Sequence, residues 1–146
     1  MNFLDVVDVL REQHDEIRRL CSQVERSQGA ERQRLFAELC RTVHRHESGE
    51  QAVVHPAIRG VAARDEVVTA RLREEGVIAR SLEELDALGT ADPGFDGRFA
   101  ALHRTLVEHM AREESDEFPL LRLYVRPQRL RWMVGELHDI QVLGNA

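Results

Sequence analysis

Two short segments of the sequence repeat the same pairing of ionisable side chains. "HESGE" at 46–50 and "HMARE" at 109–113 each begin with a histidine and end, four residues later, with a glutamate. Residues four apart lie on one face of an α-helix, so each pair presents an imidazole and a carboxylate together. Both pairs interrupt an apolar stripe. Because a carboxylate buried without a partner costs several kcal/mol, metal ions between the two pairs are the simplest explanation.

The two segments belong to a longer internal repeat. Residues 36–59 align with residues 99–122 at a constant offset of 63, and nine positions are identical without a gap. The identical positions include both members of each pair and one proline, as His46/His109, Glu50/Glu113 and Pro56/Pro119. The repeat predicts two similar helical hairpins related by a pseudo-twofold axis, with both pairs facing one core.

Two further positions complete the expected site. His14 lies between Leu10 and Ile17 in the apolar stripe of the first helical pattern, and "HDEIRR" at 14–19 aligns with "EGVIAR" at 75–80. Glu75 therefore takes the place of His14 on the third helix, although it could also be a solvated acid beside Glu74. The six predicted ligands are His14, His46, Glu50, Glu75, His109 and Glu113. Three imidazoles and three carboxylates suit two iron ions, with the carboxylates bridging and the imidazoles terminal.

Four long stretches with helical spacing of apolar residues position these side chains. They span about residues 2–26, 31–54, 65–88 and 96–121, with breaks such as "SQGAE" and "GTADPG" between them. Asn2 with Asp5 can cap the first helix, and Pro56 disturbs the end of the second.

Short connections make an up-down-up-down four-helix bundle the expected all-α fold. We assign it to residues 1–125. Residues 126–146 form a C-terminal extension with a short fifth helix, beginning at Pro127 and stopping near Gly144. This extension packs on the bundle or at a subunit contact.

The other ionisable residues near the pairs receive no role. His44, His55, His103 and His138 have no partner in the repeat and are interpreted as partly buried or surface residues. Glu47 and Glu114 adjoin the pairs; either could supply a bridging oxygen, but outward-facing acids are the favoured interpretation. We predict no catalytic residue beyond the metal ligands. The sequence contains no Glu-x-x-His, so the ferritin-type di-iron motif is absent, and two cysteines are too few for a Cys-rich zinc site.

This set of residues resembles the hemerythrin-like family, whose HHE cation-binding domain carries a His, a His-x-x-x-Glu, another His and a second His-x-x-x-Glu on successive helices. The resemblance covers roughly residues 5–124, and "VVHPAIR" and "EFPLLR" resemble the helix ends that follow the pairs. Glu75 departs from the pattern, since the family usually has a histidine on the third helix. The resemblance implies an oxo- or hydroxo-bridged non-haem di-iron site that handles O2, peroxide or nitric oxide. Manganese and zinc stay open as alternatives, because the same ligands serve all three metals.

Two functions follow from such a site. The first is a di-iron redox protein, with catalase-like or peroxidase-like activity as one outcome, and the second is a module that senses or stores iron or oxygen without turnover. A helical interaction protein without metal is the remaining alternative. Glu75 in place of a neutral imidazole adds one negative charge, which favours the ferric pair. The sequence thus predicts a poor O2 carrier and a better partner for peroxide or nitric oxide.

Composition limits the other partners. A formal net charge of −6 makes nucleic acid an unexpected partner, because phosphate binding needs a cationic face. No apolar stretch approaches the ~18 residues that a membrane span needs, and the N-terminus carries acids where a signal peptide has bases. We therefore expect a cytoplasmic protein without a membrane partner. All 20 basic residues are arginine, which indicates a GC-rich bacterial source. The oligomeric state is left open.

Overall fold

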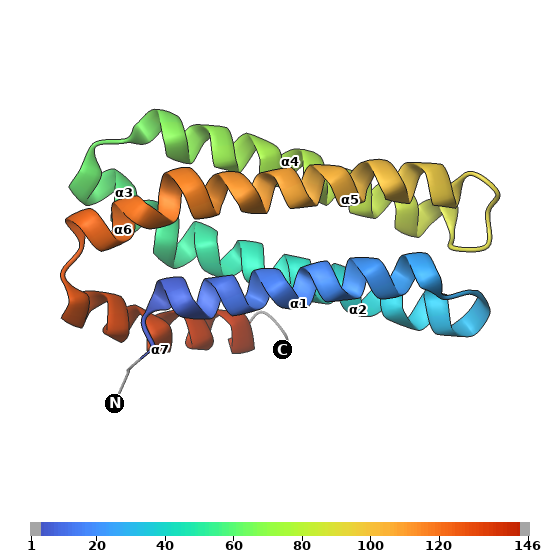
Figure 1. Cartoon of the computed structure of the whole chain (residues 1–146), viewed down its shortest axis with the longest axis horizontal. Helices are drawn as coiled ribbons and strands as arrows, with labels where there is room; N and C mark the ends of the chain where they lie inside the picture. The colour runs from blue at the N-terminus through green and yellow to red at the C-terminus, as the bar shows by residue number, and fades with distance from the viewer. Residues whose placement is uncertain (1–3, 144–146) are drawn as a thin grey trace.

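The fold is a bundle of helices. The computed structural model describes residues 4–143, and every regular element in that range is helical. Four long helices lie side by side along the long axis of the molecule (Figure 1). They are α1 (Val6–Arg26), α2 (Gly29–Gly49), α4 (Asp65–Leu88) and α5 (Phe95–Arg112). The prediction of an all-α helical bundle is confirmed at this level.

Shorter elements extend this bundle at one end. The π-helix η1 (Glu50–Val54) and α3 (His55–Ala62) continue α2. In the same way the π-helix η2 (Glu113–Glu117) and α6 (Phe118–Tyr124) continue α5. The last element, α7 (Pro127–Leu143), lies against α1 and α2 (Figure 1).

Both π-helices precede a proline and lie at equivalent positions of the internal repeat. In η1 the backbone N–H of His55 donates to the carbonyl of Glu50, five residues earlier. Pro56 and Pro119 lack an N–H, and their rings collide with the carbonyl four residues back in a regular α-helix, so the preceding turn widens. The expectation that the second helix ends before Pro56 is therefore wrong. The helix changes pitch and continues to Ala62.

The ends of the helices follow local hydrogen-bonding chemistry. Asp5 Oδ1 accepts from the backbone N–H of Asp8 at 3.0 Å, and Asp8 Oδ2 accepts from the N–H of Asp5 at 3.1 Å. This reciprocal cap starts α1 at Val6, whereas the expected cap at Asn2 lies outside the described residues. α4 spans the predicted range and stops at Gly89, whose φ of 91° suits a residue without Cβ.

A polar layer divides the apolar core into two clusters. One cluster fills the end of the bundle near the α1–α2 and α4–α5 connections, and includes Ile17 and Phe99. The other lies beneath α3, α6 and α7, and includes Leu10 and Phe118. His14 lies between these clusters on α1, fully buried. The apolar helix faces therefore enclose a slab of ionisable side chains midway along the bundle.

The contact between α7 and the bundle depends on a glycine. A Cβ atom at Gly49 would overlap Leu137 Cδ1 and lie 3.0 Å from Gln141 Nε2. Leu137 is fully buried in the second apolar cluster. Glycine at position 49 thus lets α7 approach α2 directly beside the polar layer.

Candidate metal centre

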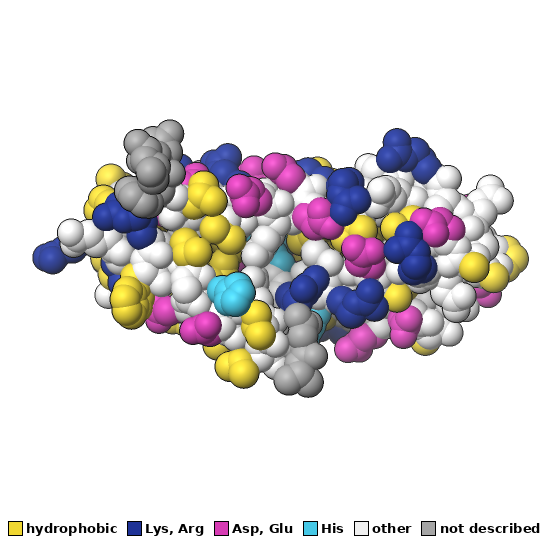
Figure 2. All heavy atoms as spheres, turned by 90° about the horizontal axis from the view of Figure 1, so that it is seen from below, with side chains coloured by type: hydrophobic (Ala, Val, Ile, Leu, Met, Phe, Trp, Pro, Cys, Tyr) yellow, Lys and Arg dark blue, Asp and Glu magenta, His cyan; other side chains and the backbone are white. Residues whose placement is uncertain are grey.

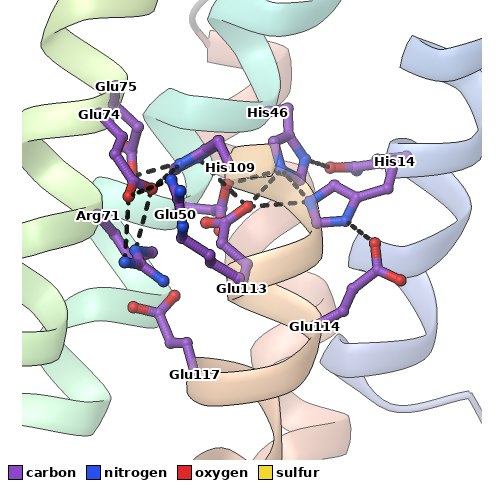
Figure 3. Close-up of polar contacts among 12 residues, drawn as sticks. His14, His46, Glu50, Arg71, Glu74, Glu75, His109, Glu113, Glu114 and Glu117 are labelled. Carbon is purple, nitrogen blue, oxygen red and sulfur yellow. Dashed lines mark hydrogen bonds and ion pairs between the residues drawn. The ribbon is translucent and has the colours of Figure 1, made fainter. Parts of the chain in front are cut away.

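The structure brings the six predicted side chains together in the polar layer (Figure 3). Each is 3% exposed or less, so the cluster is closed to bulk solvent. They come from all four long helices and from both π-helices: His14 (α1), His46 (α2), Glu50 (η1), Glu75 (α4), His109 (α5) and Glu113 (η2). The alternative of a solvated Glu75 is wrong, because its side chain is buried.

Ring nitrogens and carboxylate oxygens converge at short range. His14 Nε2 lies 3.0 Å from both His46 Nε2 and Glu113 Oε1. His46 Nε2 lies 2.6 Å from Glu50 Oε1, and His109 Nε2 lies 3.4 Å from Glu113 Oε1. In an octahedral site with bonds of about 2.1 Å, neighbouring ligand atoms lie about 3.0 Å apart. The separations match those of ligands on shared cations.

Each of the three histidines is oriented by an oxygen acceptor at its other nitrogen. His14 Nδ1 lies 2.8 Å from Glu114 Oε2, and His46 Nδ1 lies 2.8 Å from Gln13 Oε1. His109 Nδ1 lies 2.7 Å from Glu74 Oε1. These acceptors assign the ring hydrogen to Nδ1 and leave a lone pair on Nε2, which points into the cluster. This is the arrangement that metal-binding histidines generally adopt.

The donor set fits metal cations. Neither carboxylate oxygen of Glu50 has a hydrogen-bond partner among the described residues, and Glu113 Oε2 and His109 Nε2 also lack one. Three overlapping groups of four donors have their atoms within 4.8 Å of one another, and Glu50 and Glu113 belong to all three. A buried layer with lone pairs and carboxylates but few hydrogen-bond donors needs positive charge. Glu50 and Glu113 thus offer a carboxylate to a cation bound by any of the three groups.

The electrostatics of the metal-free cluster point the same way. Burial raises the pKa of Glu50 well above its usual range, and the nearby charge of Glu113 raises it further. Burial also lowers the pKa of His46 to about 4, so its ring is neutral at pH 7. Both pKa shifts show that burial disfavours the charged forms of these side chains. A bound cation would offset the free-energy cost of burying the charged carboxylates.

Two acids beside the pairs differ from their expected outward orientation. Glu47 is buried, and desolvation together with the charges of Glu75 and Glu113 raises its pKa to about 9. Glu114 is half-buried and contacts His14 Nδ1, with Arg18 Nη2 2.5 Å from the same oxygen. Glu47, directly after His46, and Glu114, directly after Glu113, therefore both turn inward.

The structure also places two residues in the cluster that sequence reasoning missed. His55 is 2% exposed, with Nε2 2.8 Å from Glu75 Oε2 and Nδ1 2.9 Å from Glu117 Oε2. Its interpretation as a partly buried or surface histidine is wrong. Burial alone would lower the pKa of His55, but contacts with Glu117 and Glu75 outweigh it and raise that pKa to about 10. Glu117 lies four positions after Glu113, a spacing that could have placed it on the same helix face. His55 lies five positions after Glu50, and α-helical spacing gives no such signal for it.

A model of the family described as hemerythrin HHE cation binding domain matches residues 5–121. The chain belongs to this family. The resemblance inferred from the histidine and glutamate pairs is thereby confirmed. Membership in the HHE family, together with the buried groups of histidine and glutamate, supports a metal-binding site in the polar layer.

Two similar proteins extend the comparison. An HHE cation-binding domain-containing protein from Mycobacterium kansasii, known from its crystal structure, shares the HHE fold with a TM-score of 0.83. The alignment covers 94% of this chain and 88% of that chain at 21% identity. A DNA nickase from Nostoc sp. (strain PCC 7120 / SAG 25.82 / UTEX 2576) is 25% identical over 121 residues. That match covers 82% of this chain and 34% of the nickase, so this chain spans about a third of that relative's length.

Proposed function

We propose that this HHE-family protein is a non-haem di-iron protein that reacts with O2, peroxide or nitric oxide. The observation that carries the proposal is the sharing of Glu50 and Glu113 by overlapping donor groups. His14 and His46 would hold one ion, His109 and Glu75 the other, and the two shared carboxylates would bridge them. Bound iron would supply reversible redox change and open positions for small diatomic or peroxidic ligands.

The chain's own residues prepare the site for this chemistry. Glu114, Gln13 and Glu74 fix the rings of the three histidines, so little reorganisation is needed when ions bind. Burial of the donors excludes bulk water from the reacting centre. Glu75 adds a negative charge that a neutral imidazole would not, which favours the oxidised pair. This charge supports peroxide or nitric oxide chemistry over reversible O2 carriage, with catalase-like or peroxidase-like turnover as the expected activity.

A second function, iron or oxygen sensing or storage without turnover, is favoured by the unpaired buried carboxylates. Glu50 lacks hydrogen bonds to the described residues, so the metal-free bundle carries an energetic penalty that metal relieves. Metal binding would then change the stability of the helices and would not lead to turnover of a substrate.

We infer an up-down-up-down bundle of two pseudo-repeated hairpins, since both π-helices occur at the repeat offset. None of the helices in the described part of the chain has the length and apolar character that a membrane crossing requires. On the face that carries α7, acidic and basic side chains are interspersed (Figure 2). The absence of a nucleic-acid partner stays a prediction, since one relative is named a DNA nickase.

Metal content per chain tests the proposal directly. The parent protein, expressed in iron-supplemented medium, is expected to hold two iron ions per chain and to show near-ultraviolet absorption from a bridged pair. Glu113→Ala should lower the iron content, whereas His103→Ala, a half-buried histidine outside the cluster, should not. Oxygen release from peroxide would favour the redox protein, and metal-dependent folding without turnover would favour the sensor. A folded parent chain that binds no metal would overturn both.

A further inference from the structure

His55 occupies the polar layer together with the predicted ligands, and we propose that it is a fourth imidazole ligand, bound to the ion near Glu75. This inference rests on the proposed di-metal site. One ion would receive two imidazoles, from His14 and His46, whereas the other would receive only that of His109. His55 would give each ion two imidazoles.

The position of His55 matches that of a ligand. Its Nε2 atom lies 2.8 Å from Glu75 Oε2, within the 2.6–3.4 Å range of the pairs already described. His55 also forms one of the three donor groups, with Glu50, Glu113 and Glu117. Glu117 is fully buried, and neither of its oxygens has a well-formed hydrogen bond to a described residue. The donors around His55 thus include both carboxylates that the two ions would share.

The orientation of the His55 ring repeats that of the other three histidines. Its Nδ1 atom lies 2.9 Å from Glu117 Oε2, and the three corresponding Nδ1-to-oxygen distances are 2.7–2.8 Å. In all four rings an oxygen thus lies within 2.9 Å of Nδ1, and Nε2 faces the carboxylate cluster, although the Nδ1 contact of His55 is not aligned as a hydrogen bond. With an ion bound at Nε2, the ring hydrogen of His55 would lie on Nδ1, beside Glu117 Oε2.

The backbone explains how His55 reaches this position. Five residues turn an ideal α-helix by about 500°, which would point His55 about 140° away from Glu50. The π-helical bond from His55 N–H to Glu50 O closes a wider turn and brings both side chains to the same side. The π-turn before Pro56 thus brings the imidazole of His55 into the polar layer, from which regular α-helical pitch would point it away.

A competing arrangement has His55 donate a hydrogen bond to Glu75 without touching an ion. Proton NMR of the cobalt(II)-loaded protein distinguishes this arrangement from coordination. A paramagnetic ion shifts the Nδ1–H resonance of each coordinated imidazole far outside the normal proton spectrum. Cobalt-loaded parent protein should show four such exchangeable resonances. His55→Gln, which retains a hydrogen-bond donor, should show three, while His44→Ala, an exposed histidine on α2, should keep four.

Calorimetry with cobalt(II) provides the second readout. His55→Gln and His55→Ala should both weaken binding of one of two ions by at least about 10-fold. Two bound ions with three shifted resonances in the parent, unchanged in His55→Gln, would overturn the role of His55 and leave the di-metal site intact. A parent chain that binds no cobalt would overturn the di-metal site itself. Circular dichroism establishes that each variant is folded.

Discussion

The Nε2 atoms of His14 and His46 lie 3.0 Å apart, although each ring already directs its Nδ1 hydrogen to an oxygen acceptor. Two lone pairs that face each other at this distance repel unless a cation lies between them. A cation bound between the two rings would remove this repulsion.

Metal should accordingly stabilise the fold. Addition of iron(II) without oxygen to chelator-treated protein is expected to raise the free energy of unfolding by about 4 kcal/mol at a free concentration of roughly 1,000 times Kd. Thermal unfolding followed by circular dichroism measures the shift in Tm. His46→Ala should abolish most of the shift, and an equal shift in that variant would contradict the role of His46.

The metal-free protein should become more stable when a buried carboxylate is removed. Glu50→Leu is expected to raise the free energy of unfolding without metal by about 1–4 kcal/mol, because an apolar side chain of similar volume replaces an unpaired acid. Denaturant unfolding in the presence of a chelator measures it. Glu83→Leu, on the exposed face of α4, should change stability by less than about 0.5 kcal/mol. Destabilisation by Glu50→Leu would show that the carboxylate is satisfied without metal.

Residues behind the ligands should affect affinity without touching metal. Gln13 Oε1 accepts from His46 Nδ1, and Gln13 and Gln141 also exchange two hydrogen bonds of 2.9 and 3.0 Å. Gln13→Leu should weaken metal binding by about 10–100-fold, since the ring loses its acceptor. Gln141→Leu leaves the acceptor in place and serves as the matched control in calorimetric titrations. Equal affinities for the two variants would rule out orientation by Gln13.

Glu75 should set the reduction potential of the bound pair. Glu75→His removes one negative charge from the donor set, so the potential is expected to rise, by an amount on the order of 100 mV. A spectroscopic redox titration of the iron-loaded proteins measures the difference. Identical potentials in parent and variant would contradict the charge argument.

Acid should remove a separate stabilising contact at the start of α1. Burial opposes ionisation of Asp5, but hydrogen bonds from Arg122 and the Asp8 backbone outweigh it and lower the Asp5 pKa below 3.8. Because the pKa of Asp5 is lower in the folded state, ionised Asp5 adds to the free energy of unfolding above about pH 4. This stabilisation is lost as the pH falls through the folded-state pKa.

Asp5→Asn preserves the helix cap and removes only the charge. At pH 7 it should lower the free energy of unfolding by about 0.5 kcal/mol, and the difference should vanish as the pH falls through the folded-state pKa of Asp5. Arg122→Gln should produce the same loss in denaturant titrations. A difference that persists undiminished at low pH would contradict the ionic origin.

Regular spacing explains what the sequence predicted well. His14, His46, Glu75 and His109 were found because each interrupts an apolar stripe with a period of 3.6 residues, and the structure places them all in the buried layer. The C-terminal end of α4 followed from the glycine and proline that end the pattern.

Irregular helical pitch and packing between helices explain what was missed. His55 lies at a spacing that α-helical geometry assigns to another face, and only the π-turn before Pro56 brings it inward. Glu47 was interpreted as an outward acid because its neighbour His46 points inward. Its burial depends on the packing of α2 against other helices, which the spacing of residues along one helix does not contain.

The π-helices make the donor set depend on helical pitch as well as on residue type. A substitution that restored ordinary pitch at unchanged chain length, such as Pro56→Ala, would point His55 about 140° away from Glu50. His55 would then leave the layer although no codon for a donor residue had changed. Deletion of one exposed residue in η1, such as Ala52, would instead place His55 four residues after Glu50 and keep both on one helix face. Substitutions that alter the pitch at residues 50–54 and 113–117 would thus change which side chains meet in the core, a route to divergence that comparison of aligned ligand positions would overlook.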